Sequence, residues 1–243
     1  GQGSWPAFWM MPTDSVYGGW PKSGEIDIME AVNLKVPNEA GVAEANVHGT
    51  LHYGRDFPNN ESSGKAYLLP DDINPADDFH TYAIEWQEGE IRWYVDGYLF
   101  QTQMASEVRY NSKDEPAGLI HRGWFSEYFD IATGELETHW DASPFDQRFH
   151  LLLNLAVGGN WPANVNNTGI DAAAFADGHR PGQLRRVAVA AQPGAAVRAG
   201  AALASASTDQ TKSHTPKATP QRKPVHAPSG YRHHQAPSSG RCP

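Results

Sequence analysis

The chain has 243 residues, 40% of them hydrophobic, and a formal net charge of −9. This length and hydrophobic content suffice for one sizeable core. The first 190 residues contain no basic patch, so the phosphate attraction on which nucleic-acid binding depends is missing. No apolar run approaches the roughly 20 residues that cross a bilayer. We therefore expect neither nucleic acid nor membrane as a partner.

Aromatic residues greatly outnumber methionines, and glycines punctuate the sequence. Eight tryptophans, nine tyrosines and nine phenylalanines accompany 23 glycines, against four methionines. Such a composition favours many short strands over long helices. The single cysteine, Cys242, cannot form an internal disulfide and leaves the redox compartment open. The sequence therefore predicts an all-β protein of antiparallel strands, a sandwich or jelly roll.

Acidic and apolar residues interleave at strand spacing in residues 24–31, GEIDIMEA. Glu25 and Asp27 share one face of this predicted strand. Glu30 lies five residues after Glu25, so strict alternation would send it to the opposite face. A β-bulge near Ile28 and Met29 would return Glu30 to the side of the other two acids. The pattern therefore predicts three carboxyl groups on one face.

Three neighbouring acids repel one another, which is a costly way to build an ordinary sheet. A retaining glycosidase needs two carboxyl groups about 5 to 5.5 Å apart, one as nucleophile and one as acid. Repulsion raises the pKa of one acid and keeps it protonated while another stays ionised. The pattern thus predicts glycoside hydrolysis. A solvated strand edge and a calcium site built from three carboxylates are the alternatives.

Further strands follow along the chain, each with apolar and polar residues in alternation. Asp96-Gly97 supplies the positive-φ pair of a tight hairpin, and Gly158-Gly159 ends the last of these strands. The predicted strands are residues 47–53, 79–86, 91–95, 98–100 and 149–156.

From Ala191 onward the chain is rich in alanine and then in Pro, Ser, Thr, Lys and His. It holds seven Lys/Arg and one Asp, whereas residues 1–190 hold 12 basic and 27 acidic side chains. Such a segment buries too little apolar surface to offset its ordering entropy. We expect a domain over residues 1–190 and a disordered tail over residues 191–243. His233-His234 lack the ligand spacing of a metal site, so we expect no metal there.

Several segments, in order, resemble glycoside hydrolase family 16, in particular its bacterial laminarinase-like endo-β-1,3-glucanases. The resemblance covers residues 1 to about 171 and rests on WPAFWM (5–10), GGWP (18–21), SGEIDIME (23–30), VHGT (47–50), FHTY (79–82) and NLAVGGNWP (154–162). It implies a jelly roll of two packed sheets whose concave face forms a glucan cleft.

The resemblance also assigns catalytic roles. It implies Glu25 as nucleophile, Glu30 as general acid/base and Asp27 as the carboxylate that orients and tunes them. The inserted Met29 matches the bulged form of the motif that is typical of laminarinases. Relative to the family, strands before Gly1 are missing and residues 183–188 replace the usual closing strand. We therefore expect an N-terminally truncated member with an atypical C-terminus.

Tryptophans are candidates for binding sugar rings, because pyranose C–H groups pack against aromatic faces. Trp20, just before the acidic strand, is the first candidate, followed by Trp5 and then Trp161. Core packing is the alternative for each of them. Trp9, beside Phe8, is the tryptophan that we expect to be buried.

Two polar candidates complete the predicted substrate-binding set. The resemblance places His48 near the reaction centre, and an ordinary sheet histidine is the alternative. His52 ranks below it. Asn154 interrupts an apolar strand and is expected to reach into the cleft, with a buried amide bonded to backbone as the alternative.

The resemblance implies an enzyme that hydrolyses internal β-1,3 bonds of laminarin-like glucan with retention, by double displacement. We expect it to act as a monomer, without a redox cofactor or catalytic metal. A structural calcium with unassigned ligands is possible within the family. The alternatives are another β-linked polysaccharide (mixed-linkage glucan, agar or carrageenan), a carbohydrate-binding module, or an inactive truncated fragment. We expect an extracellular or periplasmic location, with the signal peptide lost along with the missing N-terminus.

Overall fold

The computed structural model describes residues 1–164, 187–192 and 195–201, and in these ranges the chain consists mostly of strands. Among the described residues, no helix has the length and apolar character needed to cross a bilayer. The helical elements are a 3₁₀ turn (Pro70–Asp72) and α1 (Asn160–Asn164). The strands are β1 (Ser4–Pro12), β2 (Glu25–Glu30), β3 (Val47–Tyr53), β4 (Glu61–Tyr67), β5 (Tyr82–Gln87), β6 (Glu90–Val95), β7 (Tyr98–Met104), β8 (Glu107–Tyr110), β9 (Pro116–His121), β10 (Ser126–Phe129), β11 (Leu136–His139), β12 (Phe149–Val157), β13 (Val187–Gln192) and β14 (Ala195–Ala201).

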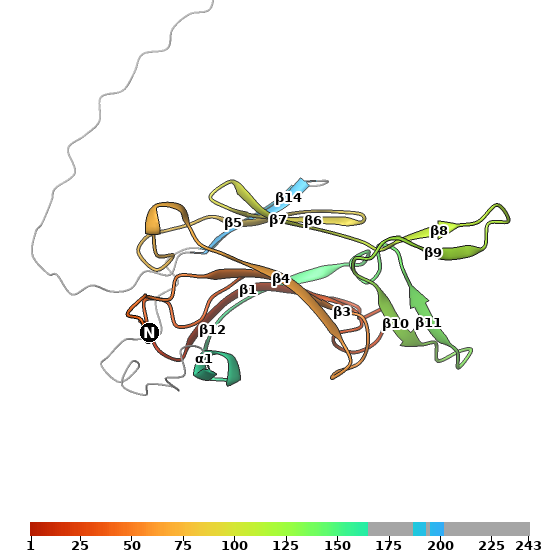
Figure 1. Ribbon diagram of the computed structural model, residues 1–243, viewed down its shortest axis with the longest axis horizontal. Coiled ribbons are helices and arrows are strands. Elements are labelled where there is room, and N and C mark those ends of the chain that lie inside the picture. Colours follow the sequence, from red (N-terminus) through yellow and green to blue (C-terminus); the bar gives the residue numbers. More distant parts are fainter. Residues whose placement is uncertain (165–186, 193–194, 202–243) are drawn as a thin grey trace, which may run out of the picture. The chain divides into compact units, whose positions relative to one another are not determined.

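Two five-stranded antiparallel sheets form the body, with strand orders β12-β1-β2-β3-β4 and β13-β14-β5-β6-β7. They lie as two layers in Figure 1, where the hairpins β8–β9 and β10–β11 extend beyond one end of the layers. This is the predicted all-β jelly-roll sandwich. The strand β2 lies in the middle of its sheet, so both of its edges are paired.

Apolar side chains from both sheets meet between the layers. Phe8, Ile26 and Leu51 come from the first sheet, and Ile84 and Trp93 from the second; each is fully buried. Burial of such large side chains is the main favourable term in folding. In β3 every second residue is therefore buried, and the intervening residues are left for the opposite face.

Trp93 links the second sheet to the acidic strand. Its indole Nε1 donates a hydrogen bond of 2.8 Å to the backbone oxygen of Asp27. The ring lies against Gly49 of β3, where a Cβ atom would stand 2.6 Å from Trp93 Cδ1. Glycine is thus required at position 49 for the indole to reach the strand β2.

The predicted hairpin at Asp96-Gly97 is confirmed, with φ values of 51° and 82° between β6 and β7. The strand predicted over residues 79–86 begins only at Tyr82. Asp96 explains the difference, because its Oδ1 accepts the Thr81 N–H at 2.7 Å while its Oδ2 lies 2.7 Å from His80 Nδ1. At Thr81, the Asp96 side chain therefore takes the place of the backbone carbonyl that would accept the N–H in a strand ladder.

The second sheet also contains part of the predicted tail. The strand β14 pairs with β13 and with β5, with Val197 opposite Ile84. Residues 191–192 and 195–201, which the composition assigns to the tail, lie in β13 and β14. The other residues of that tail lie outside the described ranges, and the division at residue 190 stays a prediction.

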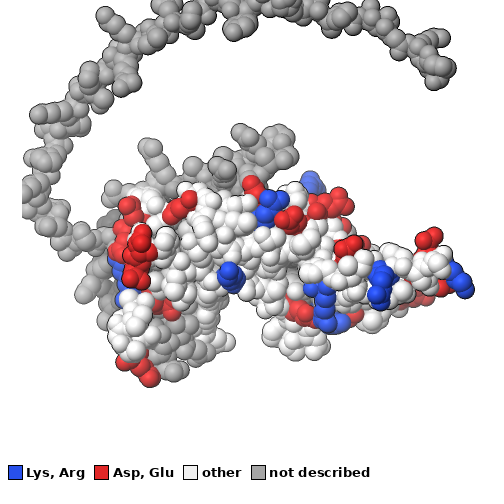
Figure 2. Space-filling view, turned by 45° about the horizontal axis from the view of Figure 1, so that its top comes forward, with Lys and Arg blue, Asp and Glu red and all other residues white. Residues whose placement is uncertain are grey.

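Surface charge is mixed. On the face of the described residues drawn in Figure 2, Lys and Arg side chains are scattered among Asp and Glu and form no continuous basic patch.

Candidate active site

The acidic strand β2 carries the predicted bulge. Between Asp27 and Glu30, the register with β3 slips by one residue. On the β1 side, the pairing passes directly from Asp27 to Met29, so Ile28 is left without a partner. The extra residue restores Glu30 to the face of Glu25 and Asp27, as the spacing predicts.

The three carboxyl groups differ in exposure. Asp27 is 1% exposed, whereas Glu25 and Glu30 are half-buried. An indole N–H holds each glutamate: Trp20 Nε1 donates to Glu25 Oε2, and Trp5 Nε1 donates to Glu30 Oε1 at 2.9 Å. Both tryptophans are predicted site residues. Their role as hydrogen-bond donors to the acids did not follow from the sequence, because it depends on tertiary placement.

Burial is the largest cause of the altered acidity. Together with the negative charge of Asp27, it raises the pKa of Glu25 to about 7. Burial also raises the pKa of Asp27 and of Glu30. The sequence interpretation attributed the shift to like-charge repulsion, which is the smaller effect. The physical reason is that desolvation disfavours the charged form of any carboxyl group buried to this depth, whatever its neighbours.

His52 approaches the acids closely. It stands opposite Glu25 in the register of β3, and its Nε2 lies 3.3 Å from Asp27 Oδ2. Its ring is also 6.0 Å from the ring of Trp20. His52, which ranks below His48 as a candidate from the sequence, is thus the histidine whose ring nitrogen lies beside Asp27. The register of β3 against β2 decides which histidine faces which acid, and the sequence alone does not reveal that register.

His48 lies at the Glu30 end of the three carboxyl groups, whereas His52 lies at the Glu25 end. It stands opposite Glu30 in the register, and its ring lies 5.0 Å from that of Trp161, edge to face. Trp161, on α1, also makes an edge-to-face contact of 5.2 Å with Trp5. Burial lowers the pKa of His48, so the neutral imidazole is favoured. The structure thus brings three predicted binding residues together beside Glu30.

Asn154 and Trp9 occupy the same face of the sheet. Asn154 is exposed on β12, and its Oδ1 accepts a hydrogen bond of 2.7 Å from Trp9 Nε1. The alternative of a buried amide is excluded. The expected burial of Trp9 was also wrong, because Phe8 takes the core position and alternation turns its neighbour outward. Trp9 is half-buried.

The Glu25 end has an aromatic surface of its own. Trp20 is 43% exposed and Phe57 is 69% exposed, with ring centroids 6.1 Å apart. Phe57 lies in the loop after β3 and was not among the predicted residues. Aromatic side chains therefore flank the carboxylates at both ends, which suits an extended sugar chain.

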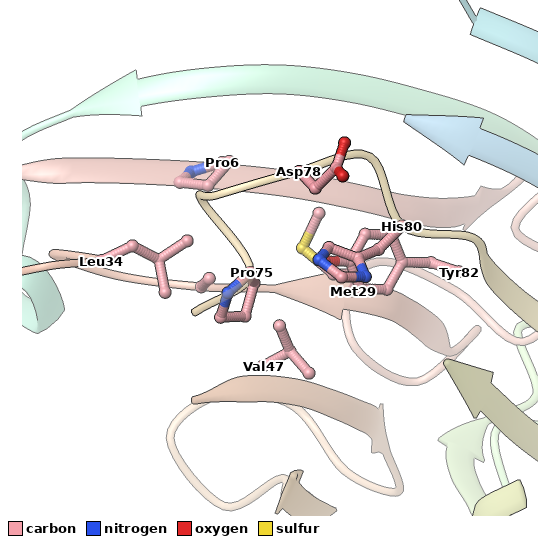
Figure 3. Close-up of a pocket in the computed structure, with 9 residues that line it drawn as sticks. Pro6, Met29, Leu34, Val47, Pro75, Asp78, His80 and Tyr82 are labelled. Atoms are coloured by element: carbon pink, nitrogen blue, oxygen red, sulfur yellow. The ribbon is translucent and has the colours of Figure 1, made fainter. Parts of the chain in front are cut away.

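A separate pocket lies behind the bulge, on the core side of β2. It is lined by Met29, Val47, Tyr82 and other mainly apolar residues, as Figure 3 shows. None of the three acids lines it. The pocket is therefore not the site of acid chemistry.

Comparisons with known proteins relate this chain, including its acidic strand, to a family of enzymes. The family model for glycosyl hydrolases family 16 matches residues 1–142, which include the acidic strand, Trp5, Trp20 and His48. The chain is 38% identical over 161 residues to glucan endo-1,3-beta-glucosidase A1 of Niallia circulans, covering 66% of this chain and 19% of that protein. It is 36% identical over 178 residues to the beta-glucanase of Rhodothermus marinus, covering 72% of this chain and 49% of that protein.

Among solved structures, the laminarinase of Rhodothermus marinus is 31% identical, with a TM-score of 0.47, over 82% of this chain and 60% of that one. The chain spans less than half the length of either of the two relatives above. The family model, by contrast, covers more than half of this chain. The protein therefore belongs to glycosyl hydrolases family 16.

Proposed function

We propose that the protein is a retaining endo-glycosidase that cleaves internal β-1,3 bonds of laminarin-like glucans. The observation that carries the proposal is the bulged strand β2, which places Glu25, Asp27 and Glu30 on one face. The relatives named above are a glucan endo-1,3-beta-glucosidase and a beta-glucanase, which supports glucan as the substrate class.

The chemistry proceeds in two displacements. Ionised Glu25 attacks the anomeric carbon, and Glu30 gives its proton to the departing glycosidic oxygen. Glu30 then removes a proton from water, whose oxygen attacks the same carbon and releases Glu25. The indole N–H of Trp20 orients the attacking carboxylate. Burial raises the pKa of Glu30, a shift in the direction that favours the protonated acid of the first step.

The proposal also covers the location of the enzyme, its oligomeric state and its cofactors. We place the protein outside the cytoplasm, in the compartment where glucan polymers are met, and we propose that it works as a monomer. The reaction needs no redox cofactor, because the oxygen of water replaces the glycosidic oxygen on the anomeric carbon without a net change of oxidation state. A structural calcium would be separate from this chemistry.

The test is hydrolysis of laminarin by the full chain, followed by reducing-sugar release and by viscosity. An endo-enzyme lowers viscosity well before most bonds are cut. Proton NMR early in the reaction should show the β anomer of the new reducing end first, because two inversions restore the configuration. Lichenan and agarose serve as parallel substrates. Early α anomer, or hydrolysis of agarose in preference to laminarin, would contradict the proposal.

The pH dependence offers a second prediction. Glu25 acts when ionised, and its pKa is raised to about 7, so activity should fall as the pH falls through this region. The charge of Asp27 contributes to that rise. Asp27→Asn should therefore lower the pKa of Glu25 and move the acidic limb of kcat/KM to lower pH, with a lower maximum.

The measurement is kcat/KM on laminarin across the acidic and neutral range. Asp14→Asn is the matched control, since Asp14 is exposed and pairs with Arg148 at the surface. Its profile should coincide with that of the unmodified chain. An acidic limb that stays in place or rises in Asp27→Asn would refute the assigned electrostatic role.

A further inference from the structure

We propose that Glu25, Asp27 and His52 form a binding site for a zinc-like divalent cation, which inhibits glucan hydrolysis. The inhibition rests on the proposed function, whereas the binding does not. Each of the three residues offers one ligand atom, and these atoms lie within 4.8 Å of one another. Two carboxylate oxygens and an imidazole nitrogen are a donor set that Zn²⁺ accepts.

One pair of these atoms already has the spacing of metal ligands. In tetrahedral zinc sites with bonds of about 2.0 to 2.1 Å, neighbouring ligand atoms lie about 3.3 to 3.4 Å apart. His52 Nε2 and Asp27 Oδ2 are 3.3 Å apart. Glu25 stands directly across the sheet from His52, and its longer side chain can rotate to supply the third ligand. The fourth position is left for water.

A second observation points to a ligand at this place. Asp27 is 1% exposed, and within the described part of the chain no donor reaches its carboxylate oxygens with hydrogen-bond geometry; the polar groups beside them are His52, whose Nε2 lies 3.3 Å from Oδ2, and the Glu25 carboxyl. A buried acceptor without a partner costs free energy. A cation bound to Asp27 Oδ2 would remove that cost. The imidazole favours zinc-like ions over Ca²⁺ or Mg²⁺, which prefer shells made of oxygen.

Occupancy of this site would block the reaction directly. A metal bound to the carboxylate of Glu25 would occupy the lone pair that attacks the anomeric carbon. Glu30 would not be a ligand, because it lies outside the ligand group and its Oε1 accepts a hydrogen bond from Trp5. The cation should therefore compete with the glucan for the enzyme.

Binding is tested with Co²⁺, whose visible absorption is strong only in tetrahedral or similarly distorted coordination. The chain has eleven histidines, so the number of ions bound is compared between variants. The full chain and the control His121→Gln, an exposed histidine on β9, should bind one more tetrahedral Co²⁺ than His52→Gln or Glu25→Gln. Thermal melting checks that each variant is folded. Equal stoichiometry and spectra in all four proteins would overturn the proposal.

Inhibition is tested with Zn²⁺ during laminarin hydrolysis. Zn²⁺ should raise the apparent KM with little change in kcat, and His52→Gln should need about tenfold more Zn²⁺, or higher, for the same inhibition. Equal sensitivity of His52→Gln and the full chain would overturn the inhibitory role. If the chain does not hydrolyse laminarin, the Co²⁺ titration still decides whether the site exists.

Discussion

Replacement of Glu25 by alanine is expected to lower kcat on laminarin by at least about three orders of magnitude, because the attacking carboxylate is lost. The variant should remain folded, since Glu25 is half-buried and the core lies on the other face of β2. Added azide should restore turnover of a dinitrophenyl β-glycoside of a short β-1,3-glucan. Azide then attacks from the vacated position, opposite the leaving group, and gives the α-glycosyl azide.

Glu30→Ala is the matched counterpart and separates the two roles. Dinitrophenolate leaves without protonation, so the glycosyl-Glu25 intermediate still forms in this variant. Azide should attack that intermediate and give the β-glycosyl azide, with configuration retained. Product configuration is read by NMR. If Glu25→Ala gave the β product and Glu30→Ala the α product, the assigned roles would be exchanged.

Removal of Trp93 is expected to have the largest effect on stability. The side chain is 0% exposed, and its Nε1 donates to the backbone of Asp27 at 2.8 Å. Trp93→Ala should lower the free energy of unfolding by about 3 to 5 kcal/mol, because a large cavity remains between the sheets. Trp93→Phe keeps most of the apolar contact but leaves the Asp27 carbonyl oxygen without its donor, which costs about 1 to 3 kcal/mol.

Urea unfolding followed by circular dichroism measures these differences. Tyr110→Ala is the control: Tyr110 is 59% exposed on β8, so its loss should change stability by less than about 0.5 kcal/mol. Gly49→Ala tests the same contact from the other side, since its Cβ would stand 2.6 Å from the Trp93 ring. If Gly49→Ala matched the unmodified chain in stability, the close packing of Trp93 on β3 would be refuted.

Local patterns in the sequence were sufficient for much of the site. The five-residue separation of Glu25 and Glu30 required a bulge, because strand side chains alternate with a period of two, and the structure has it. Asp96-Gly97 likewise predicted its hairpin from the backbone conformations that these residues tolerate. Such features depend on a few neighbouring residues, so they can be derived without knowledge of the rest of the chain.

Other features depend on contacts between segments far apart in the sequence. The pairing of His52 with Glu25, and of His48 with Glu30, follows from the register of β2 against β3. The outward position of Trp9 follows from which face of β1 meets the second sheet. The dominant influence on the three acids is burial, which is a property of the assembled sandwich.

The sequence by itself thus determined the all-β class, the bulged acidic strand and the identity of its three carboxyl groups. Only the tertiary structure decided which histidine reaches Asp27, which indoles hold the glutamates and how far burial alters their acidity. The physical reason is the distance along the chain over which each effect acts. Alternation and turn preference act within a few residues, whereas register and desolvation are set by packing between strands that are distant in the chain.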